Sequence, residues 1–208
     1  MATRGLFVTF EGGEGAGKST QVALLKARLE AEGRRVVVTR EPGGTTVGEK
    51  IREMLLYNDG IDVKTEQSLF WAARGELVRK IIHPSLESGA IVISDRFTDS
   101  NLAYQGFGRG LDVPLLRRVN SWLTEGLVPD LTVLLDIPIF DGRQRKLLDD
   151  DTFFKEQTEF HERVRKGYLE LAATEPLRWL VLDGFKRPQD LSDAVYSAVA
   201  GLLRASLS

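Results

Sequence analysis

The fold of this chain follows from the stretch Gly12-Gly13-Glu14-Gly15-Ala16-Gly17-Lys18-Ser19, which fits the pattern G-x-x-x-x-G-K-[ST]. An apolar, β-rich run, Leu6-Phe7-Val8-Thr9-Phe10, comes directly before it. After it, Val22, Leu25 and Leu29 recur at helical spacing. A phosphate-binding loop must lie between a strand and a helix, so the flanks meet the requirement that the bare pattern leaves open.

The residue types in this stretch suit a triphosphate. Glycines let the backbone curl so that successive N–H groups converge on phosphate oxygens, with a helix N-terminus behind them. We expect the whole stretch to bind ATP, Lys18 to reach the β- and γ-phosphates, and the Ser19 hydroxyl to bind Mg²⁺. The alternative, an ordinary glycine-rich turn, does not account for the strand and helix on either side.

Composition limits the other possibilities. With 208 residues and 42% hydrophobic content, the chain is expected to form one domain, residues 1–208. It contains no cysteine, which excludes disulfides and cysteine-bound metal. A net charge of −2 argues against binding a nucleic acid polymer. The sequence has neither a signal-peptide apolar region nor an apolar run of membrane length, so we expect a cytoplasmic protein that does not bind membranes.

Strand and helix signals alternate along the whole chain. The expected strands are 6–11, 35–40, 90–95, 131–136 and 179–183, and the expected helices are 18–32, 47–56, 66–88, 113–124, 154–175 and 188–206. This alternation predicts an α/β fold, a five-stranded parallel sheet with helices on both faces. Such sheets bind ligands at the carboxyl ends of their strands.

Two arginines follow apolar strands at this edge. Arg40 comes after Val36-Val37-Val38-Thr39 and is placed to hold a second phosphate; the alternative is a surface arginine paired with Glu41. Asp95-Arg96 ends the strand Ile91-Val92-Ile93-Ser94. There a carboxylate can hold Mg²⁺ while the guanidinium binds phosphoryl oxygens, unless the two form only a strand-end ion pair.

The helix expected from Glu66 has one arginine in an otherwise apolar row, Phe70, Arg74, Val78 and Ile82. A ring that stacks on a flat base and an arginine that donates to a base carbonyl would form half of a nucleobase pocket. Taken alone, the row favours the alternative of a packed ring and a snorkelling arginine.

A further polar cluster, Ser100-Asn101-Leu102-Ala103-Tyr104-Gln105-Gly106, follows Arg96 closely. Asn101 and Gln105 can each donate and accept hydrogen bonds, which suits a pyrimidine edge, and Tyr104 offers a rigid wall beside a sugar. The alternative is a helix cap and a turn.

In this order and spacing, the motifs resemble those of the thymidylate kinase family, within the nucleoside monophosphate kinases. The resemblance runs from Leu6 to Leu171 and is most specific in the blocks Glu11 to Lys18, Thr39-Arg40-Glu41-Pro42-Gly43-Gly44, Ala72-Ala73-Arg74, Asp95-Arg96 and Ala103-Tyr104-Gln105-Gly106. It implies a phosphate-loop kinase fold. It also implies Mg²⁺-dependent transfer of the γ-phosphoryl group of ATP to thymidine monophosphate, in nucleotide biosynthesis, by a homodimer.

The resemblance also assigns roles to residues. Arg40 and Arg96 match the residues that bind the acceptor phosphate, and Phe70 matches the ring that stacks on thymine. Arg74 matches the contact to a base carbonyl and Asn101 the reader of the thymine edge. Tyr104 matches the residue that crowds the sugar 2′ position. Glu14 resembles the carboxylate that orients the acceptor sugar and the arginine near it.

The chain departs from some relatives in its cations. Its phosphate loop lacks arginine, so the family pattern places the catalytic arginine on a lid, here the short segment 141–154. An Asp-Arg pair usual in the family stands here as Asp151-Thr152. The remaining lid cations are Arg143, Arg145 and Lys146; Arg145 aligns best with the catalytic arginine, and Arg143 is expected to contact ATP. The alternative is a solvated basic helix face.

Three other functions share parts of this pattern. A regulatory GTPase has the same loop, but the chain has neither Asn-Lys-x-Asp nor a strand followed by Asp-x-x-Gly. A nucleoside kinase or another monophosphate kinase would keep the loop and Asp95-Arg96 and change the base pocket. A nucleotide-binding module that has lost catalysis through its depleted lid is the third.

Overall fold

The computed structural model of the protein describes residues 4–58, 60–138 and 151–205. Its single sheet has five parallel strands in the order β2-β3-β1-β4-β5. The strands are β1 (Phe7–Glu11), β2 (Val36–Arg40), β3 (Ile91–Asp95), β4 (Leu131–Asp136) and β5 (Trp179–Asp183). All five lie within one residue of their predicted bounds, and the predicted fold class is confirmed.

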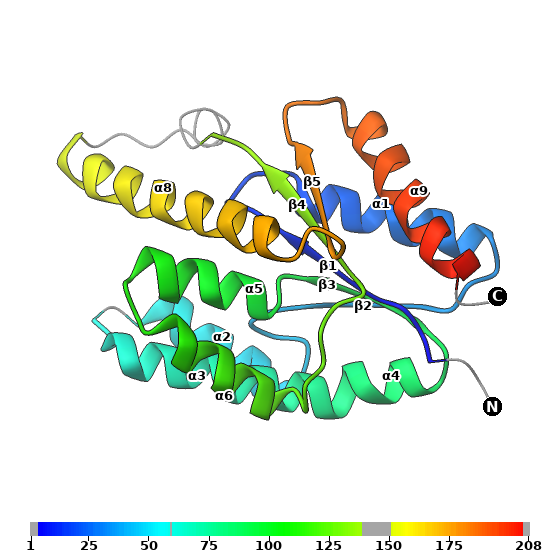
Figure 1. Cartoon of the computed structure of the whole chain (residues 1–208). Coiled ribbons are helices and arrows are strands. Elements are labelled where there is room, and N and C mark those ends of the chain that lie inside the picture. Colours follow the sequence, from blue (N-terminus) through cyan, green and yellow to red (C-terminus); the bar gives the residue numbers. More distant parts are fainter. Residues whose placement is uncertain (1–3, 59, 139–150, 206–208) are drawn as a thin grey trace.

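Helices cover both faces of the sheet (Figure 1). They are α1 (Lys18–Ala31), α2 (Thr46–Tyr57), α3 (Val63–Leu77), α4 (His83–Glu87), α5 (Thr98–Asn101), α6 (Val113–Leu123), α8 (Asp151–Thr174) and α9 (Pro188–Ala205), with π-helical segments η1 (Val78–Ile82) and η2 (Leu102–Gly108). None of these helices is long and apolar enough to span a membrane.

Alternating side chains of each strand build two cores. Val8 and Phe10 point to the face covered by α1 and α9, where they are fully buried with Ile93 and Val133. Phe7 points the other way and packs with residues of α3, η1 and α4. A further cluster on that face joins α6, η2 and α8 to β4. Because a strand turns successive side chains to opposite faces, the sheet is held from both sides and its carboxyl edge is a fixed platform.

The helix predicted at 66–88 is longer and less regular than its pattern suggests. It begins at Val63, because the Asp62 carboxylate accepts hydrogen bonds from the N–H groups of Lys64 and Thr65 at 2.9 and 3.3 Å. It widens into η1 just before Pro84, which has no N–H to donate to the preceding turn.

The largest difference from the prediction is the helical stretch α5–η2, residues 98–108, where no helix was predicted. Its glycines have low helix propensity and give the sequence the appearance of a turn. Gly108 lets this segment approach α8 closely, since a Cβ atom there would lie 2.6 Å from the ring of Phe160. The segment is therefore a helix whose sequence is adapted to packing rather than to helix propensity.

Candidate active site

The phosphate loop connects β1 to α1 with the backbone that its glycines allow. Gly12 has φ +132°, and a Cβ atom there would lie 2.5 Å from the Leu135 carbonyl oxygen. Gly17 caps α1 in the left-handed conformation, with φ +91°. No acidic residue occupies the first turn of α1, so the positive end of the helix dipole is open to an anion. Gly13, Glu14 and Gly15 form the exposed crest of the loop.

Lys18 lies inside this loop. Its Nζ atom donates hydrogen bonds to the carbonyl oxygens of Gly12 and Gly13 at 3.1 and 2.8 Å. Burial and the charge of Arg96 lower the pKa of Lys18 to about 8. Both of these acceptors are neutral carbonyl oxygens, and phosphate oxygens would be stronger ones.

Ser19 and Asp95 meet at the carboxyl end of the sheet, as predicted. The Ser19 hydroxyl donates to Asp95 Oδ2 at 3.3 Å. A hydroxyl and one carboxylate suit Mg²⁺, which keeps several waters and binds few protein groups alongside substrate phosphates. Among the described residues no cluster of three or more His, Cys, Asp or Glu could hold a metal by itself. Ser19 and Asp95 therefore fit a magnesium ion that binds together with the nucleotide phosphates rather than one that the protein holds by itself.

Arg40 lies beside this pair, because β2 pairs with β3 so that Arg40 is opposite Asp95. Its Nη2 atom bonds Glu49 Oε2 at 2.8 Å, and both side chains are half exposed. The neighbour considered as its alternative partner, Glu41, pairs with Arg74 instead. An exposed ion pair of this kind contributes little, so the Arg40 guanidinium is available to a phosphate at small cost.

Arg96 follows Asp95 and points toward a group of hydroxyls. Its Nη1 atom donates to Ser100 Oγ at 3.0 Å and its Nη2 atom to the Tyr104 hydroxyl at 3.2 Å. The guanidinium carbon lies 4.8 Å from the centre of the Tyr104 ring. Asp95 and Arg96 therefore do not form a mere strand-end ion pair: Asp95 contacts the loop and Arg96 contacts α5, η2 and α8.

Arg74 is buried rather than snorkelling, so that alternative is wrong. Its side chain is 2% exposed, and its Nε atom bonds both carboxylate oxygens of Glu41, at 3.0 and 2.9 Å. Its Nη1 atom donates to Asn120 Oδ1 at 2.8 Å. Phe70, on the same helix, is half-buried. Burial raises the pKa of Glu41, and the Arg74 charge opposes that rise.

Asn101 and Gln105 belong to a buried amide cluster next to Arg74. Asn101 Nδ2 donates to Gln67 Oε1 at 2.6 Å and to Gln105 Oε1 at 3.1 Å. Asn101 Oδ1 accepts from Asn120 Nδ2 at 3.1 Å. The cluster can donate to and accept from a flat polar edge. The alternative of a cap and turn is wrong, since Asn101 lies within a helical stretch.

Nearly the whole chain matches the sequence pattern of one protein family. The profile described as thymidylate kinase matches residues 10–195. A thymidylate kinase of Deinococcus radiodurans is 48% identical over 202 residues, covering 95% of this chain and 98% of the relative. One of Desulfovibrio desulfuricans is 45% identical over 210 residues, covering 96% and 97%. The chain belongs to the thymidylate kinase family. The resemblance inferred from the motifs is confirmed.

Sequence reasoning about this family member missed four buried residues of the site: Glu11, Glu41, Asn120 and Tyr168. Glu11 and Glu41 were visible as carboxylates inside quoted motifs, and an acidic residue that ends an apolar strand is a signal in itself. Asn120 and Tyr168 lie in ordinary amphipathic helices, and no local feature of the sequence marks them.

The lid of the thymidylate kinase family was expected at 141–154. Arg143, Arg145 and Lys146 lie outside the described residues, which resume with α8 at Asp151.

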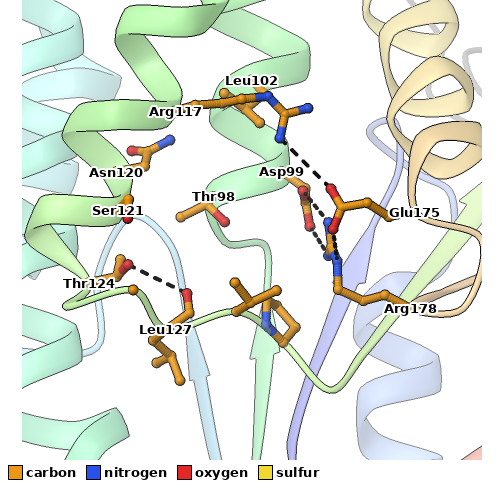
Figure 2. A pocket seen from close by; sticks show the side chains of 13 residues that line it. Thr98, Asp99, Leu102, Arg117, Asn120, Ser121, Thr124, Leu127, Glu175 and Arg178 are labelled. Atoms are coloured by element: carbon orange, nitrogen blue, oxygen red, sulfur yellow. Dashed lines mark hydrogen bonds and ion pairs between the residues drawn. The ribbon is translucent and has the colours of Figure 1, made fainter.

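A cavity of about 240 Å³ lies near the amino ends of β4 and β5, away from the phosphate loop (Figure 2). Arg178 enters it and bonds Asp99 Oδ2 at 2.7 Å and Glu175 Oε2 at 2.9 Å. Arg117 lies 3.8 Å from Glu175. The four charged residues that line the cavity are thus paired with one another, and none of the predicted site residues that the structure describes lines it.

Proposed function

We propose that the protein transfers the γ-phosphoryl group of ATP to thymidine monophosphate, giving ADP and thymidine diphosphate. The observation that carries the proposal is that Lys18, Asp95 and the two arginines Arg40 and Arg96 share one edge of the sheet, beside a buried amide cluster. The loop accounts for the triphosphate and the arginines for a second phosphate. Membership of the thymidylate kinase family favours thymine as the base.

The proposed chemistry rests on positioning and charge. Phosphoryl transfer passes through a loose transition state with charge on the equatorial oxygens, so placed cations supply most of the acceleration. Lys18 and the loop N–H groups would hold the triphosphate, and Arg40 and Arg96 the acceptor phosphate. Mg²⁺, held by Ser19 and Asp95, would neutralise charge on the β- and γ-oxygens. Glu14, on the exposed crest, would orient the acceptor sugar.

The acceptor base would lie over the amide cluster. In this proposal Phe70 stacks on the thymine ring and Arg74 donates to a base carbonyl. Asn101, supported by Gln105, reads the thymine edge. Tyr104 stands beside the sugar and disfavours a 2′ hydroxyl. The support for these roles is the family pattern, together with the contacts of Arg74 with Asn101 and of Tyr104 with Arg96.

ADP release with ATP, Mg²⁺ and a panel of nucleosides and nucleoside monophosphates tests the function. We expect turnover with thymidine monophosphate at a kcat/KM at least about tenfold above that of any other acceptor, a modest demand on a hydrogen-bonding pocket. Preference for a nucleoside would indicate a nucleoside kinase, and absence of turnover with every acceptor would indicate a binding module. Either result contradicts the proposal.

The lid cation of this proposal is Arg145, with Arg143 contacting ATP. An arginine aimed at the transferring group contributes on the order of 10³–10⁵ in rate. Arg145→Ala is therefore expected to lower kcat by at least about 10²-fold, while Lys146→Ala, the neighbouring cation, stays near wild type. Wild-type turnover by Arg145→Ala would show that another group supplies the charge.

We also propose a homodimer in the cytoplasm. The support is the family resemblance and several apolar side chains exposed on α2 and α6, among them Met54, Leu56 and Trp122. A solution mass twice the 23.2 kDa of one chain is the expected result, and a mass of one chain would refute the dimer.

A further inference from the structure

The backbone of Arg96 needs support. It has φ +74°, and Glu125 is its sole companion among the described non-glycine residues with positive φ. A non-glycine residue in this region costs on the order of 1–3 kcal/mol and persists where its surroundings hold it. The Arg96 N–H donates to the Phe10 carbonyl at 2.9 Å, and its own carbonyl accepts from Ser94 Oγ at 2.6 Å. The side chain emerges from a fixed point.

The guanidinium is held by hydroxyls that in turn contact one buried carboxylate. Besides Ser100, the Nη1 atom of Arg96 donates to the Tyr168 hydroxyl at 3.3 Å. Tyr168 donates to Glu11 Oε2 at 3.0 Å, and Ser100 Oγ donates to the same oxygen. Glu11 is 0% exposed and its other oxygen accepts from the Phe97 N–H at 2.9 Å. The hydroxyl groups of Ser100 and Tyr168 thus connect the Glu11 carboxylate to the Arg96 guanidinium.

The number of protons available makes the hydrogen bonding of this cluster depend on the protonation of Glu11. Ser100 Oγ and the Tyr168 hydroxyl also lie 2.7 Å apart, so three short contacts join Glu11, Ser100 and Tyr168. When Glu11 is ionised, two hydroxyl protons serve these three contacts; a proton on Glu11 would supply the third. Burial, and then the charge of Asp99, raise the pKa of Glu11 to about 7.

Three elements meet in the cluster. Glu11 ends β1 immediately before the phosphate loop, Ser100 belongs to α5, and Tyr168 belongs to α8, the helix that follows the expected lid. Tyr168 is 1% exposed, so its hydroxyl has no route to solvent as an alternative partner. The ring of Tyr104 contacts that of Tyr168 edge to face, with centres 6.3 Å apart.

We propose that Glu11 and Tyr168 are positioning residues that fix the Arg96 guanidinium for the acceptor phosphate. The proposal rests on the proposed function, in which Arg96 binds that phosphate. The planar fork of an arginine binds phosphate well only if its direction is set beforehand. A displacement of about 1 Å in such a group can cost on the order of 10²-fold in rate. Neither Glu11 nor Tyr168 touches the acceptor; both act through Arg96.

Tyr168→Phe tests the hydroxyl without removing the ring. We expect kcat/KM for thymidine monophosphate to fall about tenfold, because one of the three hydroxyl anchors of Arg96 is lost, while KM for ATP stays within about twofold. The matched control is Tyr196→Phe, since the Tyr196 hydroxyl also donates to a glutamate, Glu32, but on the surface far along α9. Circular dichroism verifies that both variants fold.

Glu11→Gln adds a pH readout that a merely structural role would not move. The groups facing Glu11 are Arg96, Asp99 and Tyr168, and Lys18 also feels its charge. Below pH 7 the wild-type carboxyl takes up a proton and, like the amide of the variant, carries no negative charge near the Arg96 guanidinium. We therefore expect the ratio of wild-type to Glu11→Gln kcat/KM to be about tenfold at pH 8 and to approach one at pH 6. Protonation of the substrate phosphate affects both proteins and cancels in the ratio.

The outcomes separate the two proposals. Wild-type protein without turnover of thymidine monophosphate overturns the proposed function and the positioning role with it. An active wild type with Tyr168→Phe kinetics equal to those of Tyr196→Phe, or a Glu11→Gln ratio that does not change with pH, overturns the positioning role alone. A loss shared equally by both substrates does the same, because Arg96 would then not be the group affected.

Discussion

Lys18→Ala is expected to lower kcat by on the order of 10²–10³-fold, the cost of removing one preorganised donor to developing charge. In the structure Nζ lies between the carbonyls of Gly12 and Gly13, on the inner side of the loop. Those neutral contacts keep the ammonium in place without neutralising it. Alanine removes both the charge and the reach to the β- and γ-phosphates, and no other lysine is present in the loop.

Single-turnover kinetics with thymidine monophosphate measure this effect apart from ATP binding. Lys26→Ala is the matched control, because Lys26 lies in the same helix α1 and is 46% exposed in an i,i+4 pair with Glu30. We expect the control to stay within about twofold of wild type, as exposed pairs contribute little. A Lys18→Ala protein that keeps a tenth of the wild-type rate would show that the loop N–H groups and Mg²⁺ carry the transfer without it.

Much of the fold could be predicted because its signals are local. Each strand is a short apolar run closed by a polar residue, and β4 begins and ends at the predicted Leu131 and Asp136. Parallel pairing then aligns the ends of the strands, which is why Arg40 and Asp95 were expected together and lie opposite one another. The stretch α5–η2 escaped prediction because its glycines serve close packing, Gly106 against α6 and Gly108 against α8, and such tertiary contacts leave no local signature.

Within the site, the sequence indicated which residues were unusual but not which other residues they contact. Arg74 was recognised as unusual in an apolar row, but its partner Glu41 lies 33 positions away and could not be chosen among the other acidic residues. The Glu11–Tyr168 contact spans 157 positions and joins the first strand to a late helix. Such side-chain pairings depend on how the helices and strands pack. The sequence pattern of either element alone does not indicate them.

The second large effect is expected for Arg74→Met, which leaves the Glu41 carboxylate buried without its cation. The two side chains are 2% and 6% exposed, and removing one partner of such a pair costs about 3–5 kcal/mol in the free energy of unfolding. Arg79→Met is the control, because Arg79 and its partner Glu125 are 75% and 58% exposed and their pair contributes less than about 1 kcal/mol. Urea unfolding measures both.

The sign of the pH dependence follows from Glu41. Burial already raises its pKa in the folded protein, and loss of Arg74 raises it further, while the unfolded chain titrates normally. Protonation therefore favours the folded variant, and this contribution is present at low pH and lost as pH rises. We expect Arg74→Met to be less destabilised at pH 5 than at pH 8. Equal destabilisation at both pH values would contradict an uncompensated carboxylate.

The double variant Arg74→Met with Glu41→Gln separates the structural role of Arg74 from its proposed role toward the base. Removing both charges eliminates the unpaired carboxylate, so most of the lost stability should return. Binding should not return, because Met has no donor for a thymine carbonyl. We expect a folded protein whose KM for thymidine monophosphate is at least about tenfold above wild type, the cost of one lost hydrogen bond to the base. If KM recovers together with stability, Arg74 acts only as the buried partner of Glu41, and the donor to the base carbonyl must be sought among the amides around Asn101.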